Sequence, residues 1–371
     1  MTSHQENPCA INLTSTSAKK YELYTEGDVL FDAMLAAIRN AKQQVLLATY
    51  IFSADEIGLR FIDVLVERAQ AGVDVRLTVD ALGSFLLLPY SIEKELTQQG
   101  VKVRRYHRWY WREPLRYNRR DHRKLLVVDS QQAFLGGFNI HRQSSLLVFG
   151  KERWRDTHVR ITGELAEEAA GLFNSFWQGK PARCPLPKVK LQDELLANHS
   201  RKCRQRLRCI YRDTFNGATK YLYVTTPYFV PDRPMQKGLI AAARRGVDVR
   251  VLVPRKSDVQ IVQWASHAAY ANLLLNGVRI FEYLPRMLHT KTIVIDDNFA
   301  TIGTSNIDYR SFFLNYELNL FSSSKNLCIQ LYDQFNNDLK EAEEIHSGSW
   351  KQRHWNLRLL EWVGWLARRW L

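Results

Sequence analysis

The chain has 371 residues, enough for two ordinary domains, and 46% of them are hydrophobic, as in a globular protein with a buried core. This composition excludes a chain that is disordered along most of its length. Lys and Arg outnumber Asp and Glu by 52 to 38, and the formal net charge of +14 favours a polyanionic partner, either nucleic acid or an anionic membrane surface.

Targeting signals and cysteine spacing limit the cellular setting. Residues 1–20 form a polar N-terminal tail without the apolar core of a signal peptide, and nowhere do about 18 apolar residues run together. The odd number of cysteines argues against a disulfide framework, and their spacing is not that of metal ligands. They are Cys9, Cys184, Cys203, Cys209 and Cys328. We therefore expect a soluble or peripheral protein in a reducing compartment.

The chain repeats itself, with the same segments in the same order. The matching pairs are VLLATYIF (45–52) with YLYVTTPYF (221–229), AGVDVRLTVD (71–80) with RGVDVRVLVP (245–254), and QGVKVRRY (99–106) with NGVRIFEY (276–283). Short β-branched runs alternating with helical periodicity predict α/β layers in each copy. The expected domains are 21–180 and 205–345, joined by a proline-bearing connection at 181–204.

A polar motif closes the repeat in each half. His122, Lys124 and Asp129 in HRKLLVVD recur as His289, Lys291 and Asp296 in HTKTIVID. Each motif is followed after six residues by a glycine-led loop, GGFN (136–139) or GTSN (303–306). The pattern HxKxxxxD should begin by chance at roughly one position in ten thousand, so two copies inside a repeated frame are not accidental.

The spacing within the motif assigns different positions to its members. In an extended strand, residues i and i+2 share a face, so His122 and Lys124 project together. Asp129 falls at an odd offset, where the strand should turn, and we expect it to be a structural partner of a buried or a backbone donor rather than a group on the reacting atom. If the two halves pack about a pseudo-twofold axis, both His-Lys faces meet at one cleft.

Two imidazoles and two ammonium groups in one cleft suit phosphodiester chemistry. The imidazoles can divide the tasks of nucleophile and acid/base, while the lysines stabilise phosphoryl oxygens. Asn139 and Asn306, on loops opened by glycine, offer amide donors to the same oxygens. Metal assistance is the weaker hypothesis because no other cluster has ligand spacing, so we expect no metal and no cofactor.

A nucleophilic imidazole also needs an acceptor that orients its second nitrogen. Glu317, 28 residues after His289, is the candidate for the second copy. Asp156, in ERWRDTHV, is the candidate for the first copy, at a different offset from its histidine. A surface charge at a strand end is the alternative for either acid.

These residues resemble the phospholipase D superfamily, whose signature is a pair of HxKxxxxD motifs, each followed by a GSxN-like loop. The resemblance covers nearly the whole chain and is greatest to bacterial cardiolipin synthases. It rests on TYIFSADEIG (49–58), VDALGS (79–84), TTPYFVPD (225–232) and GTSNIDYRSFFLNYELN (303–319). It implies two phospholipase-D-like domains, each a mixed sheet flanked by helices, related by a pseudo-twofold and sharing one active site.

The resemblance also implies an activity: transfer of a phosphatidyl group from one phosphatidylglycerol to the hydroxyl of another lipid, with release of glycerol. One of His122 and His289 is then the nucleophile of a phosphatidyl-histidine, and the other protonates glycerol and later deprotonates the acceptor. We expect His122 to be the nucleophile. The resemblance places four residues on phosphate-binding positions and two on orienting positions: Lys124, Lys291, Asn139 and Asn306, then Glu317 and Asp156.

Two departures from the family pattern stand out. Gly137 occupies the position of the family's hydroxyl residue in the first loop, whereas Thr304 retains a hydroxyl in the second, so the copies can be chemically unequal. The two N-terminal membrane-spanning helices of many cardiolipin synthases are not found here. We therefore expect the shorter, peripheral kind of enzyme at the cytoplasmic face of the membrane.

Two basic and aromatic segments suggest how such a protein could reach a lipid. In the tail 346–371, Trp355, Leu359, Trp362, Leu366 and Trp370 form one helical stripe. This predicts either an in-plane interfacial helix or a terminal helix packed on its own domain. The stretch 104–123 carries eight Arg among Tyr and Trp, typical of a solvated loop, a headgroup platform or a nucleic-acid surface.

Three rival functions remain. A phospholipase-D-type hydrolase or a nuclease of the same superfamily would use the same chemistry, and a non-catalytic membrane or nucleic-acid binder could keep the fold. The aromatic basic tail favours lipid, and binding alone needs no second imidazole. We expect phosphatidylglycerol as substrate, a membrane surface as partner and no nucleic acid; the oligomeric state stays open.

Overall fold

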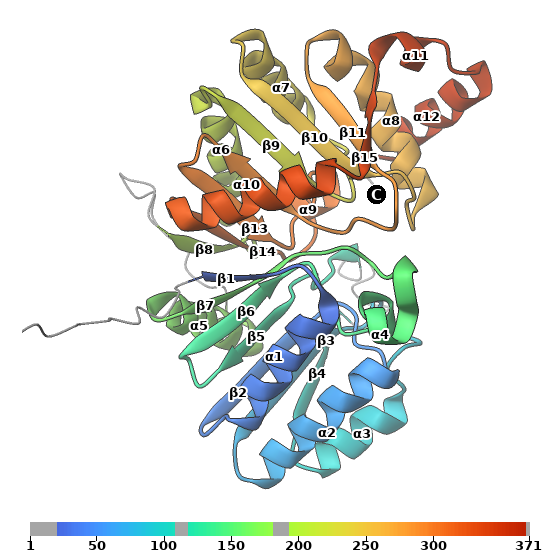
Figure 1. Ribbon diagram of the computed structural model, residues 1–371. Coiled ribbons are helices and arrows are strands. Elements are labelled where there is room, and N and C mark those ends of the chain that lie inside the picture. Colours follow the sequence, from blue (N-terminus) through green and yellow to red (C-terminus); the bar gives the residue numbers. More distant parts are fainter. Residues whose placement is uncertain (1–20, 108–117, 181–192, 369–371) are drawn as a thin grey trace, which may run out of the picture.

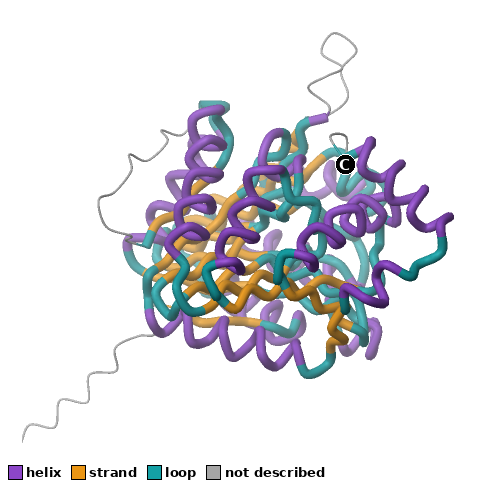
Figure 2. Tube along the Cα trace, turned by 90° about the horizontal axis from the view of Figure 1, so that it is seen from above, coloured by secondary structure: helices purple, strands orange, loops and turns teal. Residues whose placement is uncertain are grey.

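The computed structural model describes residues 21–107, 118–180 and 193–368. These residues form two layered halves, one above the other in Figure 1, with the first half coloured blue to green and the second yellow to red. Each half is a mixed β-sheet with helices on both faces, and Figure 2 shows the strands as a layer between helices. The expected α/β class and tandem arrangement are confirmed.

The elements follow in the same order in both halves. The first half contains β1 (Tyr21–Tyr24), α1 (Gly27–Arg39), β2 (Gln44–Thr49), α2 (Glu56–Gln70), β3 (Asp74–Asp80), α3 (Tyr90–Gln98), β4 (Lys102–Tyr106), β5 (Leu125–Val128), β6 (Gln132–Gly136), α4 (Leu146–Phe149), β7 (His158–Thr162) and α5 (Glu164–Trp177). The second contains β8 (Glu194–Ala197), α6 (Arg201–Gly217), β9 (Tyr221–Thr225), α7 (Arg233–Arg244), β10 (Asp248–Pro254), α8 (Gln260–Leu275), β11 (Arg279–Tyr283), β12 (Thr292–Ile295), β13 (Phe299–Gly303), α9 (Tyr309–Phe313), β14 (Leu318–Ser322), α10 (Lys325–Leu339), β15 (Ala342–Ile345), α11 (Ser347–Lys351) and α12 (Trp355–Ala367).

The two sheets share one topology. Their strand orders are β4-β3-β2-β5-β6-β7-β1 and β11-β10-β9-β12-β13-β14-β8, which correspond strand for strand. β15 is an addition at the β11 edge of the second sheet. In each sheet three parallel strands adjoin a run of antiparallel ones. The topology supports the pseudo-twofold relation inferred from the repeated segments.

Helices on both faces explain why the central strands are apolar throughout. Strands β5 (LLVV) and β12 (TIVI) are fully buried, as expected for strands covered on two sides. One face of each sheet packs against its own helices, α1 and α2 in the first half and α6, α7 and α8 in the second. The other faces, with α5 and α10, contribute to a single apolar cluster that contains side chains of both halves. The halves are therefore joined by a continuous core.

Two short backbone bridges also link the halves. Asp121 pairs with Tyr316, and Arg155 pairs with Leu288, each as a parallel bridge. Asp121 and Leu288 immediately precede the motif histidines, while Tyr316 and Arg155 immediately precede the two candidate acids. The pseudo-twofold exchanges one bridge for the other, and this detail determines how the acids reach the histidines.

Several expected boundaries differ from the observed elements. The described part of the connection 181–204 contains β8, an edge strand of the second sheet, and the first residues of α6. The tail 346–371 contains α11 and α12, with Trp370 outside the described residues. In the part of the chain that the structure describes, no helix has both the length and the apolar character needed to cross a membrane.

Candidate active site

A cavity of about 660 Å³ opens between the halves, and both motif histidines line it. Asn139 and Asn306, from the two glycine-led loops, line the same cavity. Its walls also include residues that follow the carboxyl ends of β2, β3, β9 and β10. The structure thus brings His122, His289 and the two asparagines together at one place.

Lys124 and Lys291 immediately precede the buried strands β5 and β12, and each histidine lies two residues earlier, so both side chains have a rigid base. The ammonium of Lys124 donates a hydrogen bond to the backbone oxygen of His122, at 2.8 Å. Lys291 donates in the same way to the backbone oxygen of His289, and its nitrogen lies 2.8 Å from His289 Nδ1. Both lysine side chains are buried beside their histidines.

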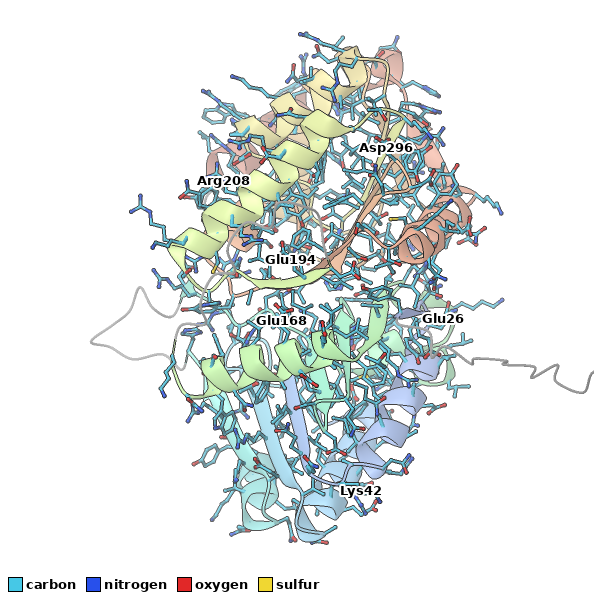
Figure 3. The ribbon with its side chains drawn as sticks, turned by 90° about the vertical axis from the view of Figure 1, so that its left-hand side faces the viewer. Glu26, Lys42, Glu168, Glu194, Arg208 and Asp296 are labelled. Atoms are coloured by element: carbon cyan, nitrogen blue, oxygen red, sulfur yellow. The ribbon has the colours of Figure 1, made fainter. Side chains whose placement is uncertain are left out.

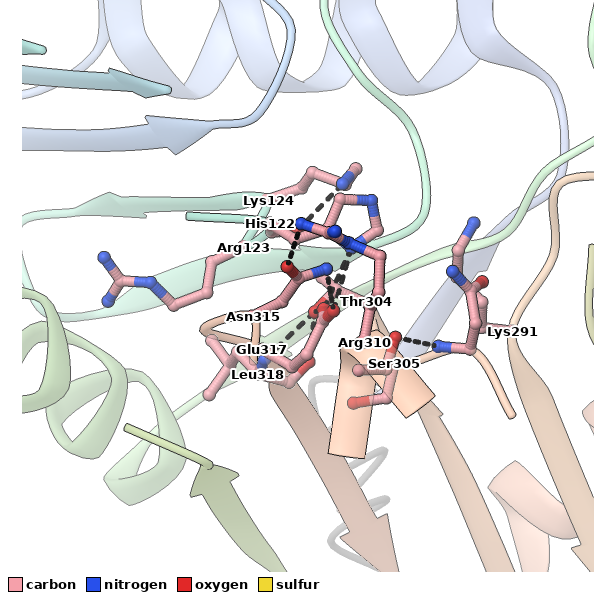
Figure 4. A network of polar contacts seen from close by, with 12 residues as sticks. His122, Arg123, Lys124, Lys291, Thr304, Ser305, Arg310, Asn315, Glu317 and Leu318 are labelled. Atoms are coloured by element: carbon pink, nitrogen blue, oxygen red, sulfur yellow. Dashed lines mark hydrogen bonds and ion pairs between the residues drawn. The ribbon is translucent and has the colours of Figure 1, made fainter. Parts of the chain in front are cut away.

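The two acids cross between the halves. Nδ1 of His122 lies 2.9 Å from Oε2 and 3.1 Å from Oε1 of Glu317, and Figure 4 shows this contact. Nδ1 of His289 lies 2.6 Å from Oδ2 of Asp156. The prediction that each acid orients the histidine of its own copy is therefore wrong, as is the alternative of surface charges, because both carboxyls are buried.

The backbone bridges explain the crossing. The backbone N–H of His122 donates to the oxygen of Tyr316 at 2.9 Å, which places Glu317 beside the histidine of the first half. The backbone N–H of His289 donates to the oxygen of Arg155 at 2.7 Å, which places Asp156 beside the histidine of the second half. These contacts join residues far apart in the chain, and offsets within one copy do not reveal them.

The two acids are supported differently. The hydroxyl of Thr304 donates to Oε2 of Glu317 at 2.5 Å, and both residues appear in Figure 4. At the corresponding Gly137, a Cβ atom would lie 1.9 Å from Oδ1 of Asp156, so the carboxylate occupies the space of the missing side chain. The backbone N–H of Thr157 donates to Asp156 at 2.7 Å instead.

The motif aspartates lie away from the cavity. Asp129 accepts hydrogen bonds from the backbone N–H groups of residues 42, 43 and 44, at 2.8 to 2.9 Å. Asp296 accepts from the N–H groups of residues 219, 220 and 221, at 2.6 to 2.9 Å. In Figure 3, Lys42 and Asp296 lie toward opposite ends of the molecule. Both aspartates fasten the turn after a motif strand to the start of a neighbouring strand.

Burial governs the electrostatics of the site. It lowers the pKa of Lys124 to about 7, with Lys291 contributing, and lowers that of Lys291 to about 8. Burial also lowers the pKa of His122, although Glu317 opposes the shift. The pKa of His289 falls well below its usual value because burial and both lysines disfavour the imidazolium. Burial raises the pKa of Asp156. A bound phosphodiester anion would favour the protonated forms of these bases.

Aromatic rings and amides complete the walls. The Tyr50 ring lies against His122 with ring centroids 5.0 Å apart, and the Trp154 ring lies 5.1 Å from His289. Asn315 and Arg310 line the cavity on the side of Glu317. Sequence reasoning assigned no role to these four residues, although all lie within or next to the quoted motifs. Among the described residues, no group of His, Cys, Asp and Glu is arranged to hold a metal ion.

The basic stretch 104–123 is not uniformly a surface. Its residues 108–117 lie outside the described part of the chain. Arg120 is buried with Asp80, and Arg123 is buried in an ion pair with Asp121 and stacks over the Phe176 ring. Arg105 pairs with Glu93. At these three positions the Arg content is explained by the fold rather than by a partner.

The chain matches the family described as "Cardiolipin synthase, PLD-like domain" over residues 34–177 and 211–339. It is 33% identical over 366 residues to a cardiolipin synthase of Clostridium perfringens, covering 92% of this chain and 75% of that protein. It is also 33% identical to cardiolipin synthase 2 of Bacillus anthracis, covering 91% and 68%.

Solved structures show the same fold at low sequence identity. A phosphatidylserine synthase of Haemophilus influenzae superposes with a TM-score of 0.70 at 15% identity, covering 95% of this chain and 96% of that one. A polyphosphate kinase of Porphyromonas gingivalis gives 0.63 at 14% identity, covering 88% and 49%. With the paired motifs and the match to most of its length, the chain belongs to the cardiolipin synthase family of phospholipase-D-like proteins.

Proposed function

We propose that the protein is a cardiolipin synthase that transfers a phosphatidyl group from one phosphatidylglycerol to the hydroxyl of a second. The main observation behind this proposal is that His122 and His289 line one cavity, and that an acid from the opposite half contacts each of them. Two imidazoles at one phosphorus can act as nucleophile and as acid/base in turn. This pairing supports a two-step transfer better than binding alone.

In the first step, Nε2 of His122 attacks the phosphorus of the donor lipid. The bond from phosphorus to the glycerol oxygen breaks, and His289 gives its proton to that oxygen. In the second step, His289 takes the proton of the acceptor hydroxyl, whose oxygen attacks the phosphorus and breaks the bond to His122. Cardiolipin leaves and both imidazoles return to their starting states, so one glycerol is released per cardiolipin formed.

The order of roles is supported by how each ring is held. Nδ1 of His122 faces both oxygens of Glu317, which Thr304 fixes in turn, and a fixed ring suits in-line attack. Burial, Lys291 and Lys124 lower the pKa of His289, and a phosphodiester anion that enters the site would oppose this shift and favour the protonated ring. A proton acquired with substrate is what the departing glycerol requires.

The remaining polar groups would bind the phosphoryl oxygens. Lys124 and Lys291 supply positive charge from opposite sides of the pseudo-twofold. The side-chain oxygen of Asn139 accepts from the backbone N–H of Ile51 at 3.1 Å, which leaves its amide NH₂ for the substrate. Oδ1 of Asn306 is buried without a hydrogen-bond partner among the described residues and can accept from a lipid hydroxyl.

The activity is tested by incubating the protein with phosphatidylglycerol vesicles and excess chelator, then separating the lipids. We expect cardiolipin and glycerol. Phosphatidic acid as the sole product would identify a hydrolase, and DNA cleavage without lipid turnover would identify a nuclease. Replacement of either His122 or His289 by Ala should abolish product formation, and full activity in both variants would refute the site.

The nucleophile is identified with a donor lipid whose leaving group is a phenol that needs no protonation. In His289→Ala the covalent phosphatidyl-histidine still forms but is not resolved, because no base activates the acceptor. Mass spectrometry should then find a phosphatidyl adduct in His289→Ala and none in His122→Ala. The opposite pattern assigns the attack to His289, and an adduct in neither variant contradicts the covalent step.

We also propose that the protein works as a peripheral enzyme at the cytoplasmic face of the membrane and binds no nucleic acid. Its net charge of +14 suits an anionic lipid surface. Cell fractionation should recover the protein with membranes at low salt and release part of it at high salt. Recovery with nucleic acid would contradict this proposal.

A further inference from the structure

Three segments near the cavity expose large apolar side chains to solvent. We call them together the mouth surface: the loop after β3 with the first residue of α3 (82–90), helix α4 and helix α12. Leu86 in the loop and Leu147 in α4 are each 83% exposed, and Trp362 in α12 is 59% exposed. The other strongly exposed apolar members are Leu82, Phe85, Leu87, Tyr90, Leu146, Phe149, Trp355, Leu357, Leu359, Val363 and Leu366.

Hydrogen bonds place the two first-half segments at the same end of their sheet. The backbone N–H of Ala54 donates to the oxygen of Leu87 at 2.7 Å, and that of Arg142 donates to Oδ2 of Asp55 at 2.7 Å. Residues 54–55 thus lie between the loop and the segment that leads into α4. Leu82 at the start of the loop lines the cavity. The loop therefore reaches the cavity at Leu82, and the segment before α4 lies at the same end of the sheet.

Helix α12 packs on α8, whose first turn lines the cavity from the second half. A Cβ at Gly364 would lie 2.5 Å from the backbone nitrogen of Ala265, so glycine lets α12 pack closely against α8. Val262, one turn before Ala265, lines the cavity. This packing buries the Gly364 side of α12 and leaves Trp355 and Trp362 in solvent. The helix packs on its own domain, as one of the two hypotheses for the tail expected, and it also presents an exposed apolar stripe.

An ion pair joins the two halves next to α4. Lys256, in the loop after β10, lies 3.7 Å from Glu152, three residues after α4, and both side chains are well exposed. In Figure 1, α4 and α12 lie on the same side of the molecule, at the right. Exposed basic side chains accompany the apolar ones, at Arg142, Lys151 and Arg358. Apolar side chains mixed with basic ones suit an anionic bilayer.

We propose that the mouth surface inserts into the headgroup region of an anionic bilayer and so holds the cavity opening against the membrane. This rests on the proposed function, because a lipid substrate must bring its phosphate to the histidines while its acyl chains stay in the bilayer. Contacts from both halves around the opening fix the orientation of the site. A single amphipathic helix would anchor the protein without doing so.

The test compares charge insertions at the mouth with one elsewhere. The first-half variant is Leu86→Glu with Leu147→Glu, and the second-half variant is Trp362→Glu. Leu275→Glu is the matched control, because Leu275 is 60% exposed but lies at the far end of α8. Binding is measured by sedimentation with vesicles of phosphatidylglycerol and phosphatidylcholine. Turnover is measured with short-chain phosphatidylglycerol dissolved as monomers, which also reports correct folding.

We expect each mouth variant to bind vesicles at least about tenfold more weakly, with monomer turnover within about twofold of the unaltered protein. Leu275→Glu should change neither quantity. Unchanged vesicle binding in the mouth variants, or equal weakening in the control, would overturn the proposal. Loss of self-association with unchanged vesicle binding would mean that a second copy covers this surface. If the mouth variants bound vesicles more weakly but even the unaltered protein turned over no lipid, the membrane-binding surface would stand and the proposed function would be rejected.

Discussion

In the first half Gly137 leaves room for the carboxylate of Asp156, whereas in the second half Thr304 donates its hydroxyl hydrogen bond to Glu317. The residue types differ as pairs: a glycine goes with the shorter acid, and a threonine with the longer one. Each pair delivers a carboxylate oxygen to Nδ1 of a histidine, at 2.6 and 2.9 Å. The distance to the imidazole is similar, while the support behind each acid differs.

The crossing of the acids adds a second lesson from the same comparison. Because each histidine depends on an acid from the other half, neither half alone contains a complete site. The frame that surrounds the site is nearly symmetric, including the strand order and the turns held by Asp129 and Asp296. Around the imidazoles the two copies differ in the residues that support each acid, and substitutions there can separate the two roles.

The largest effect is expected from removing the charge of an acid. Glu317→Gln and Asp156→Asn each keep the shape of the side chain but lose the anion that orients and stabilises the imidazole. We expect kcat to fall by about 10² to 10⁴-fold in each variant. If the roles are as proposed, Glu317→Gln slows formation of the phosphatidyl-histidine, and Asp156→Asn mainly slows its resolution. Rapid-quench measurement of the adduct distinguishes the two steps.

The control for both acid variants is Asp213→Asn, on the exposed surface of α6, where the carboxylate forms an ion pair with its neighbour Arg212. This variant should retain full turnover. If Glu317→Gln left kcat within about twofold of the unaltered protein, the proposed positioning of His122 would be refuted.

Exchanging the supporting residues is expected to have the next largest effect. In Gly137→Thr the new Cβ would meet Oδ1 of Asp156 at 1.9 Å, so the acid must move and turnover should fall at least about tenfold. Adding Asp156→Glu recreates the threonine and glutamate pair of the second half. We expect the double variant to recover part of the lost activity, and a double-mutant cycle on kcat/KM measures the coupling. If the losses in kcat/KM of the two single variants simply added in the double variant, positions 137 and 156 would act independently.

The sequence was sufficient for much of this site because its signals are local and repeated. His122 and Lys124, two residues apart before an apolar run, indicate a shared face, and Asp129 at an odd offset indicates a turn. The crossing of Asp156 and Glu317 could not be predicted in this way, because it follows from bridges between residues about 130 to 195 positions apart. The closeness of Asp156 to Gly137 was likewise hidden, since only packing reveals which atom fills the place of a missing Cβ.

A smaller effect should appear in the binding of a simple anion. The depressed pKa values of Lys124, about 7, and Lys291, about 8, mean that both side chains are mostly charged at pH 6.5 and mostly neutral at pH 9. Inorganic phosphate should therefore raise Tm more at pH 6.5 than at pH 9. Lys124→Met should lose most of this pH dependence between pH 6 and 8, and Lys291→Met that between pH 7 and 9. An equal rise in Tm at both pH values would contradict the depressed pKa values.

The smallest effect on turnover is expected at the two turns. Partial burial alone would raise the pKa of Asp129, but three backbone N–H groups outweigh it and hold the pKa below its usual value, and the same holds for Asp296. Both residues have positive φ angles, 52° and 51°, which Asn tolerates, so Asp→Asn removes the charge without straining the turn.

We expect Asp129→Asn and Asp296→Asn each to lower the free energy of unfolding by about 1 to 2 kcal/mol at pH 7, after allowance for solvent screening, with kcat within about twofold. A depressed carboxyl pKa stabilises the fold above the unfolded value, and this contribution is lost as pH falls through the folded value. The difference from the unaltered protein should therefore narrow below about pH 4. Asp296→Asn should cost more, because Thr219 also donates its hydroxyl hydrogen bond to Asp296. Urea unfolding at both pH values measures this, and a loss of turnover without a loss of stability would place these aspartates in the chemistry instead.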